Sequence, residues 1–500
     1  MPALSRITVD QLYERRWDLL ALTSVGAFTS PLQGAIVSVA LPVMGPALHL
    51  SFAASIWVQA VFLLSMAVLL IPLGRLADHH GRVHFYLAGY AVFTVASLLA
   101  GLSMNGAWLV GSRILQGAGA ALLSATSTAI VTAVFPSQER GRALGINVMA
   151  VYLGLSVGPP LGGFLVDYLS WRWIFFVNIP IGLIVLAWGW LLLPRVERED
   201  VSAPRPDLGG ATLLGFFLIC LLVPLTFAPE WGWAASRTLV MLALSAVGLV
   251  AFVVTELRVK DPVLDLDLLL HNRLFAAANL AALLNYMALY AISILTAVFL
   301  EVVQGRSAGL TGWLMLAAPA MQALLSPLSG RLSDRIGSRV LSTGGMVITA
   351  SGMVLLATMP VSAGVGRVVA SLAVVGIGIA AFSAPNTSAI MGSVQRKQLS
   401  LASAFLGTMR VTGQALSVAV LGGIAASQLG RVGGRLLFTH GRGAGQAPLA
   451  EQAVAHYAQG FKLAMFTGAA LGLLGALVSL TRGAPVGQEP TPGERSRAPA

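Results

Sequence analysis

The stretch Gly74-Arg75-Leu76-Ala77-Asp78-His79-His80-Gly81-Arg82 closes one long apolar run of the chain and opens the next. Its pattern returns as Gly330-Arg331-Leu332-Ser333-Asp334-Arg335-Ile336-Gly337-Ser338, again at the end of an apolar run. A second pair of similar stretches is GAGAALLSATSTAI at 117–130 and GIGIAAFSAPNTSA at 376–389, separated along the chain by nearly the same number of residues as the first pair. Two repeats in register, in corresponding apolar runs, indicate a chain built from duplicated halves.

The composition around these repeats favours lipid as the main solvent. Of 500 residues, 56% are hydrophobic and only 10% are charged, and the mean hydropathy is +0.81. Soluble domains carry about a quarter charged residues. Apolar stretches long enough to cross a bilayer recur from about residue 17 to about residue 482. We therefore expect an all-α membrane protein embedded in the lipid bilayer.

Windows of about 20 apolar residues predict fourteen membrane-spanning helices. They are expected at 17–41, 52–73, 83–103, 107–134, 142–166, 173–193, 209–228, 238–256, 274–300, 309–330, 340–359, 366–392, 401–427 and 461–481. The repeats divide these spans into two bundles of six helices, with two extra helices inserted between them. The expected segments are an N-terminal tail (1–16), a first bundle (17–194), a linker with the two extra helices (195–273), a second bundle (274–482) with an external loop (427–460), and a disordered tail (483–500).

The basic residues predict the orientation of the spans. The net charge is +11, and most of the 31 Lys and Arg residues, Arg482 among them, fall in alternate links between the apolar runs, beginning with the N-terminal tail. The positive-inside rule assigns these links to the cytoplasm. We therefore expect a multi-pass protein of the cell (inner) membrane with both termini cytoplasmic. Because the basic residues form no single stripe, nucleic acid is not an expected partner.

The residues give little support to an enzyme. A membrane-embedded enzyme would need clustered His, Asp, Glu or Ser side chains within the bilayer. His79, His80 and His84 have no carboxylate cluster beyond Asp78, and the single cysteine, Cys220, lies in an apolar run. We therefore expect no enzymatic activity, no cofactor, no disulfide framework and no bound metal.

Three further stretches have distinctive spacing: LVGSRILQGAG at 109–119, GLSVGPPLGG at 154–163 and WRWIFFVNIP at 171–180. Together with the repeated loop at 74–82, they resemble the motifs of the major facilitator superfamily, and more narrowly of its fourteen-span drug:proton antiporter branch. The resemblance covers nearly the whole chain. It implies the major facilitator fold, here two six-helix bundles plus two inserted helices, and transport by alternating access.

The resemblance also assigns roles to loop and helix motifs. In the superfamily, an acid in the loop pairs with basic groups to lock the cytoplasmic gate, and Asp78 and Arg82 take these positions here, although His79 stands where a basic residue is usual. A short polar turn is the plainer alternative. The implied gate residues are Gly74, Asp78, Gly81, Arg82, Asp334 and Arg335.

The motif in the fifth span is typical of antiporters in this superfamily and favours export. Gly154, Gly158 and Gly162 recur every four residues, so they share one helix face on which a partner backbone approaches closely. Pro159 is expected to bend the helix. Gly163 completes the motif. Ordinary close packing of helices is the alternative interpretation.

The chain departs from the branch in its first span, where Gln33 replaces the usual acid. A neutral amide does not titrate near neutral pH. None of the 20 acidic residues falls at mid-depth in a predicted span. If proton coupling is retained, Asp167, Glu256 and His49 are the candidate titrating groups.

Two arginines, Arg113 and Arg410, fall inside predicted spans. An arginine in the bilayer costs at least a few kcal/mol and is expected to face a cavity or a partner, unless it snorkels to the surface. Arg113 lies in the motif that the superfamily links to proton coupling. Two buried cations without a buried acid predict an electropositive cavity that favours neutral or anionic substrates.

The function expected from these features is efflux of drugs or small molecules by alternating access, with proton antiport altered by Gln33. The alternatives are a dedicated exporter of an endogenous lipid or metabolite, and a sensor without transport activity. The expected partners are a small-molecule substrate, protons and the bilayer, and the protein is expected to act as a monomer. Each polar candidate has an alternative role in helix packing. The candidates for substrate binding or coupling are Gln33, Arg113, Arg410, Asn147, Asn285, Tyr286, Asn386 and Gln414.

Overall fold

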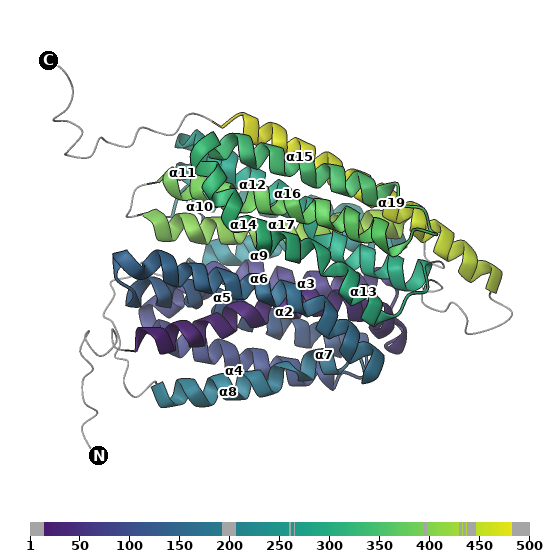
Figure 1. The fold of residues 1–500 in the computed structure, drawn as a ribbon, viewed down its shortest axis with the longest axis horizontal. Coiled ribbons are helices and arrows are strands. Elements are labelled where there is room, and N and C mark those ends of the chain that lie inside the picture. Colours follow the sequence, from purple (N-terminus) through teal and green to yellow (C-terminus); the bar gives the residue numbers. More distant parts are fainter. Residues whose placement is uncertain are drawn as a thin grey trace.

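A computed structural model describes residues 15–192, 207–259, 262–264, 266–394, 398–429, 433, 437 and 447–482. Within these residues, the regular elements are helices, most of which run along one common direction (Figure 1). In chain order they are α2 (Arg16–Ala47), α3 (Phe52–His80), α4 (Arg82–Gly101), α5 (Gly106–Val134), α6 (Ser137–Tyr168), α7 (Trp173–Phe176), α8 (Asn178–Leu192), α9 (Leu208–Trp231), α10 (Ser236–Glu256), α11 (Leu266–His271), α12 (Arg273–Val298), the π-helix η2 (Phe299–Val303), α13 (Ala308–Met315), α14 (Ala317–Ile336), α15 (Ser338–Ala357), α16 (Val365–Gly392), α17 (Leu399–Ser427) and α19 (Ala447–Leu480).

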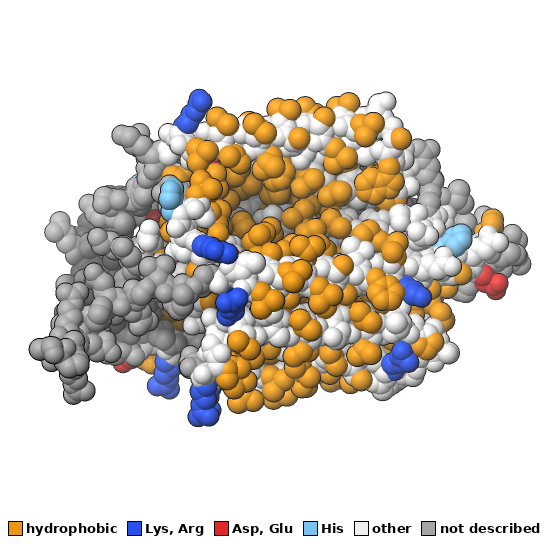
Figure 2. All heavy atoms as spheres, turned by 90° about the horizontal axis from the view of Figure 1, so that it is seen from above, with side chains coloured by type: hydrophobic (Ala, Val, Ile, Leu, Met, Phe, Trp, Pro, Cys, Tyr) orange, Lys and Arg blue, Asp and Glu red, His pale blue; other side chains and the backbone are white. Residues whose placement is uncertain are grey.

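Fourteen of the described helical segments are long and apolar enough to cross a membrane, which confirms the predicted number. Apolar side chains cover the middle of the surface, and Lys and Arg side chains lie toward its two ends (Figure 2). The start of α2 and the end of α19 lie at the same end of the bundle (Figure 1). A surface of this kind fits the bilayer, whose apolar core excludes charged groups.

Polar side chains fix the starts of several spans. Ser51, Asn105, Asp207, Asn272 and Ser307 each precede a helix and accept a hydrogen bond from the backbone N–H three residues later. Such caps satisfy N–H groups that have no partner inside the helix. The spans therefore begin at defined residues on both sides of the apolar band.

The repeated loop has the same backbone geometry in both halves. Gly81, between α3 and α4, has φ +102°, and Gly337, between α14 and α15, has φ +89°. Residues with a side chain rarely adopt such angles, so both turns require glycine. The two helix pairs that follow are alike as well. A Cβ on Gly119 would lie 2.9 Å from the Gly89 carbonyl oxygen, and one on Gly378 would lie 2.7 Å from that of Gly345.

The two inserted helices, α9 and α10, lie beside the junction of the halves. α9 contacts both α3 of the first half and α17 of the second. A Cβ on Gly215 of α9 would lie 3.0 Å from Val68 of α3, and one on Gly423 of α17 would lie 2.3 Å from the carbonyl oxygen of Leu225. The inserted pair therefore covers one side of the α3–α17 contact.

The predicted external loop at 427–460 is too long. α17 ends at Ser427, but α19 begins at Ala447, and Tyr457 is buried and donates a hydrogen bond to the Leu295 carbonyl oxygen at 2.9 Å. The glycines that suggested a loop are concentrated before residue 447, whereas the following APLAEQAVAHYAQ is rich in good helix formers. The predicted tails at 1–14 and 483–500 lie outside the described residues.

Candidate functional site

Arg113 is fully buried in α5, and neutral groups satisfy its guanidinium. Nε donates to the Val58 carbonyl oxygen at 3.2 Å, Nη2 to Gln59 Oε1 at 2.9 Å, and Nη1 to Gln116 Oε1 at 2.5 Å. The ring of Phe62 lies 4.2 Å from the guanidinium carbon. The arginine therefore has internal partners and does not snorkel to the surface, and none of the ion pairs among the described residues includes it.

The Arg113 network reaches across to the second half of the chain. Gln59 of α3 donates through Nε2 to the hydroxyl of Tyr290 in α12 at 2.8 Å, and also to the Gly34 carbonyl oxygen at 3.3 Å. A Cβ on Gly34 would lie 2.7 Å from the Tyr290 hydroxyl oxygen, so α12 approaches α2 closely at this point. A change in the spacing of the halves would break the Gln59–Tyr290 bond and remove one neighbour of Arg113.

Gln33, the residue at the position of the missing acid, is fully buried. Asn178 of α8 donates through Nδ2 to Gln33 Oε1 at 2.6 Å. Gln33 Nε2 and Asn178 Oδ1 are buried and have no hydrogen-bond partner. A neutral amide pair therefore occupies this position, and it leaves one donor and one acceptor unused.

The second half places Arg410 beside Tyr286. Arg410 of α17 is partly buried and interacts electrostatically with Tyr286 of α12, which is hydrogen-bonded to Ser383 and lies near Tyr152 of α6. No described residue forms an ion pair with Arg410. Gln414, one turn further along α17, is also partly buried. The structure thus brings Arg410 and Tyr286 together, close to the first half.

Arg482 is buried, although it follows the last span. Only 3% of the residue is exposed, and its Nη2 donates a hydrogen bond to Asn386 Oδ1. The side-chain Nδ2 of Asn386 donates in turn to the Ala278 carbonyl oxygen at 3.2 Å. Burial lowers the pKa of Arg482 to about 10. Its Nε and Nη1 are buried without partners, as are both polar atoms of Asn285. Arg482 is therefore part of the polar interior of the second half.

Asn147 lies apart from this group. Its side chain donates to Ser127 Oγ at 3.0 Å, and Ser127 Oγ donates to the Thr23 carbonyl oxygen at 3.2 Å. These contacts join α6, α5 and α2 within the first half. The geometry favours the packing interpretation for Asn147.

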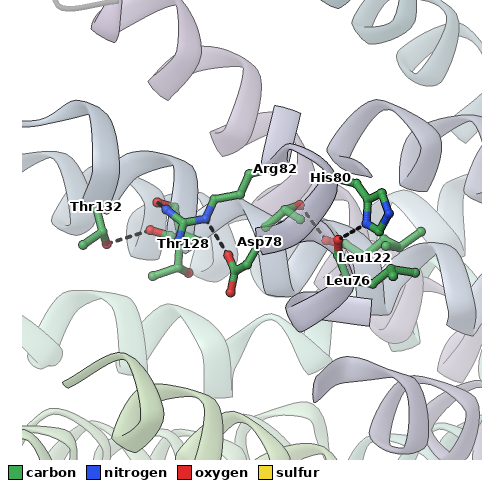
Figure 3. A network of polar contacts seen from close by, with 9 residues as sticks. Leu76, Asp78, His80, Arg82, Leu122, Thr128 and Thr132 are labelled. Atoms are coloured by element: carbon green, nitrogen blue, oxygen red, sulfur yellow. Dashed lines mark hydrogen bonds and ion pairs between the residues drawn. The ribbon is translucent and has the colours of Figure 1, made fainter. Parts of the chain in front are cut away.

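The proposed gate pair lies in direct contact within the first half. Arg82 Nε donates to Asp78 Oδ1 at 2.6 Å, and Nη1 lies 3.5 Å from the Ala129 carbonyl oxygen of α5. Figure 3 shows the Arg82 guanidinium between Asp78 and the α5 residues around Thr128, while His80 is turned away and bonds its own helix at Leu76. Both charged side chains are about one-third exposed.

The other gate residues take similar places in the fold. Gly74 faces α5, where a Cβ would lie 3.2 Å from Ala125 Cβ. In the second half, Arg335 is exposed, and the side chain of Asp334 lies outside what the structure describes. The shared backbone geometry of Gly81 and Gly337 therefore provides the likeness between the two loops.

Gly154, Gly158 and Gly162 of the fifth-span motif face α2, as their spacing of four residues predicts. A Cβ on Gly154 would lie 2.3 Å from the Phe28 carbonyl oxygen, and one on Gly162 would lie 2.8 Å from the Ile36 side chain. Gly158 lies between them, and its Cβ would meet Ala35 at 2.6 Å. Only glycine permits this approach of the two backbones.

The same helix binds the second half on its other face. A Cβ on Gly163 would lie 2.3 Å from the Ala308 carbonyl oxygen, and one on Gly312 would lie 2.2 Å from that of Pro159. Here Asp167 Oδ2 accepts a hydrogen bond from the Gly309 backbone N–H at 2.7 Å. α6 therefore joins α13 at the end of the bundle opposite Asp78.

The candidate titrating groups lie at different depths. Asp167 interacts electrostatically with Glu301 of η2, whose Oε1 is buried without a hydrogen-bond partner. Glu256 is only 3% exposed, at the end of α10, whereas His49 is exposed in a turn with φ +53°. Among the described residues, no three His, Cys, Asp or Glu side chains converge as a metal site would require.

Sequence reasoning missed Gln59 and Asn178 as members of the polar core. Each is a single amide, Gln59 within an apolar run and Asn178 within the WRWIFFVNIP motif, and no spacing rule connects them to Arg113 or Gln33. The sequence did contain one signal. Placing an amide side chain in the apolar part of a membrane costs free energy unless it has a hydrogen-bond partner, so each of these amides predicts a partner. Gln116 offered a stronger signal, since it follows Arg113 by three residues and so shares its helix face.

Known proteins similar to this chain are bacterial transporters. The multidrug resistance protein Stp of Mycobacterium tuberculosis (strain CDC 1551 / Oshkosh) is 36% identical over 418 residues, covering 83% of this chain and 77% of that protein. The tetracenomycin C resistance and export protein of Streptomyces glaucescens is 31% identical over 84% of this chain and 77% of its own length. The riboflavin transporter RibZ of Clostridioides difficile (strain 630) is 30% identical over 83% of this chain and 90% of its own length.

Solved structures share the fold. An inward-facing, occupied bacterial homolog of the human lysosomal transporter Spinster superposes with a TM-score of 0.64 at 18% identity, covering 94% of this chain and 99% of that chain. A D-xylose-proton symporter gives 0.63 at 14% identity, covering 94% and 98%. Residues 23–260 and 278–500 match the family model described as Major Facilitator Superfamily. The chain therefore belongs to the major facilitator superfamily and is a multi-pass membrane transporter rather than an enzyme.

Proposed function

We propose that this protein is an exporter of small molecules in the fourteen-span drug:proton antiporter branch of the superfamily. The fourteen spans, the glycines that α6 packs against α2, and the relatives named for multidrug resistance and antibiotic export support this assignment. In this proposal the Asp78 end of the bundle faces the cytoplasm, with both termini on that side of the cell (inner) membrane. The protein acts as a monomer, and its segments are divided as the sequence predicts, apart from the shortened loop.

The substrate is neutral or anionic. The observation that supports this most strongly is Arg113, a fully buried guanidinium whose hydrogen-bond acceptors are two amides and a carbonyl. Arg410 beside Tyr286 adds a second positive charge in the other half. A region with two cations and no paired acid attracts negative charge and repels lipophilic cations.

We infer that the described arrangement of helices is the state open toward the cytoplasm. Asp167 and Gly309 join the halves at the opposite end, and Gln59 and Tyr290 join them deeper in the bundle. At the Asp78 end, the Asp78–Arg82 pair connects helices of the first half alone. In alternating access the Asp167–Gly309 and Gln59–Tyr290 contacts would break, and each gate loop would instead contact the opposite half.

Proton coupling in this protein does not use the first-span position. Gln33 is neutral, and its bond with Asn178 gives it the role of a positioning amide. Protons are taken up elsewhere in the chain, which separates the proton site from the substrate site. A dedicated exporter of an endogenous metabolite is the second candidate, and the resemblance to a riboflavin transporter favours it.

Transport by the purified protein in liposomes tests this proposal. We expect a pH gradient, acidic on the side toward which substrate is exported, to drive movement of an anionic drug but not of a cationic dye loaded in the same vesicles. Gln33→Asp should add cation recognition or coupling, and Gln33→Asn is the matched neutral control. Robust cation export with Gln33 intact would contradict the predicted charge preference, equal proton flux in both variants would make position 33 irrelevant, and failure to move any member of a broad compound panel would favour a sensor.

A further inference from the structure

Two carboxylates meet at the Asp78 end of the inserted helices. Asp207 caps α9, where its Oδ1 accepts a hydrogen bond from the Gly210 N–H at 2.9 Å. Glu256 is the last residue of α10, and its Oε2 accepts from the Leu264 N–H at 2.8 Å. Each side chain therefore uses one oxygen to fix local backbone, and the helix pair places both carboxylates together.

The second oxygen of each carboxylate has no partner. Asp207 Oδ2 and Glu256 Oε1 are buried without a hydrogen bond. Both point into the space beside Gly210, where a Cβ would lie 2.3 Å from Glu256 Oε1 and 2.5 Å from Asp207 Oδ2. Because residue 210 is glycine, the two oxygens face each other across this space. Glu256 is only 3% exposed, so its free oxygen lies away from bulk solvent.

The charges around the pair favour a proton over a metal ion. Among the described residues, the charged groups that act on Glu256 are Asp207 from α9 and Arg75 from α3. Two ionised carboxylates whose free oxygens converge on one buried space repel each other, and a single bound proton removes that repulsion. Only two carboxylate oxygens remain free, and among the described residues no third His, Cys, Asp or Glu side chain converges on them as a metal site would require.

We propose that Asp207 and Glu256 form a proton-binding site that links the inserted helices to the gate. The proton bonds to Glu256 Oε1 and is donated in a hydrogen bond to Asp207 Oδ2, so that the pair carries one negative charge instead of two. The proton comes from water and returns to it, and no other reactant is involved. Two carboxylates this close share a proton because ionising both is costly.

Arg75 provides the link to the gate. It is the second residue of the repeated loop motif, and its guanidinium donates to the Pro262 carbonyl oxygen in the segment that leads from Glu256 to α11. If the gate loop moves during alternating access, Arg75 moves relative to the carboxylates, and the affinity of the pair for a proton changes. By thermodynamic linkage, protonation must then bias the gate to the same extent.

This inference rests on the proposed function for its role in coupling, but the site itself is tested without transport. Infrared difference spectroscopy of the purified protein detects a protonated carboxyl group through its C=O stretch. At pH 7 we expect the wild type to show the band of one protonated carboxyl that both Asp207→Asn and Glu256→Gln lack. Asn at position 207 keeps the helix cap, and it leaves Glu256 facing Arg75 without a second carboxylate. Glu451→Gln, which alters an exposed carboxylate at the other end of the bundle, is the matched control and should retain the band.

The outcomes separate the site from the function. A band that persists in both Asp207→Asn and Glu256→Gln, or a wild-type spectrum without it, would overturn the proton site. If the band behaves as expected, substrate-driven proton flux in liposomes is measured next, and we expect at least a tenfold loss in Glu256→Gln against none in Glu451→Gln. Unchanged flux in Glu256→Gln would overturn the link to coupling. A protein that transports nothing but shows the band would contradict the exporter assignment and leave the site intact.

Discussion

The two halves of this transporter share a backbone plan but treat their buried arginines differently. Arg113 in the first half has a protein acceptor for Nε, Nη1 and Nη2, and an aromatic ring covers its face. Arg482 in the second half has one acceptor, Asn386, and its Nε and Nη1 are buried without partners. Since both are almost completely buried, the difference lies in their partners and not in their depth.

This difference indicates a division of roles between the halves. A polar network whose members are satisfied is rigid, whereas unpaired buried donors cost free energy until a ligand or a rearrangement satisfies them. Asn285, whose amide has no partner at either end, also lies in the second half. The surroundings of Arg113 in the first half therefore resemble a fixed framework, whereas Arg482 and Asn285 give the second half groups that are free to bind or to change partners. The Gln33–Asn178 pair is the exception in the first half, because it leaves one donor and one acceptor unused.

The largest effect should follow from removing Arg113. Arg113→Leu leaves Gln59 Oε1, Gln116 Oε1 and the Val58 carbonyl oxygen without their donor in an apolar region, and we expect unfolding to become easier by about 3 kcal/mol or more. Transport should be lost as well. Thermal unfolding in detergent measures the effect, with Arg410→Leu as the control, because Arg410 has no ion pair among the described residues. If both variants are destabilised equally, the hydrogen bonds of Arg113 do not make it more important for stability than Arg410, which has no ion pair among the described residues.

Arg482→Gln should have the opposite sign at neutral pH. Burial lowers the pKa of Arg482 from its ordinary value to about 10 in the fold, so the charged form is disfavoured in the folded state. As the pH rises above about 10, the folded chain loses this proton before the unfolded chain does, so wild-type stability should rise with pH there. We expect Arg482→Gln to melt at or above the wild-type temperature at pH 7, and the gap to narrow above pH 10. A variant that is less stable than wild type at pH 7 would show that Arg482 is better satisfied than its contacts indicate.

The fold followed from the sequence because its signals are local and repeated. Spans were readable from apolar length, and the duplicated loop from glycines that both adopt positive φ. The length of the loop before α19 was overestimated. The glycine-rich segment ends before the apolar run of the last span begins, and the residues between them form the polar start of α19.

The candidate site was only partly predictable. Arg113 and Gln33 were identified by type and position, but their partners Gln59 and Asn178 come from other helices, and only the tertiary packing brings them together. Glu256 was recognised as a titratable residue, yet its pairing with Asp207 depends on Gly210 leaving space between two helix ends. The burial of Arg482 likewise depends on the helices that surround it.

An intermediate effect should follow from the bond that joins the two halves. Tyr290→Phe removes the hydroxyl that accepts from Gln59, and the loss of one hydrogen bond between the halves corresponds to about 0.5–1.5 kcal/mol. We expect a shift away from the cytoplasm-open state, measured as slower labelling of a cysteine introduced near Asp78. Tyr286→Phe is the matched control, because it removes a tyrosine hydroxyl from the same helix, and no hydrogen bond among the described residues joins Tyr286 to the first half. If both variants slow labelling equally, the bond between the halves has no special role in the equilibrium.

The smallest effect on stability should come from the gate pair itself. Asp78 and Arg82 are in contact at 2.6 Å, but both are about one-third exposed, so water screens their attraction. Exposed ion pairs contribute about 1 kcal/mol or less, and Asp78→Asn keeps an oxygen that can accept from Arg82. We therefore expect almost no change in melting temperature but a measurable change in transport rate, since the pair is proposed to act when the gate closes and not in the proposed cytoplasm-open state. A large loss of stability in Asp78→Asn would mean that the loop stabilises the first half, as Arg113 does. The gate would then belong to the rigid framework and could not be counted among the moving parts.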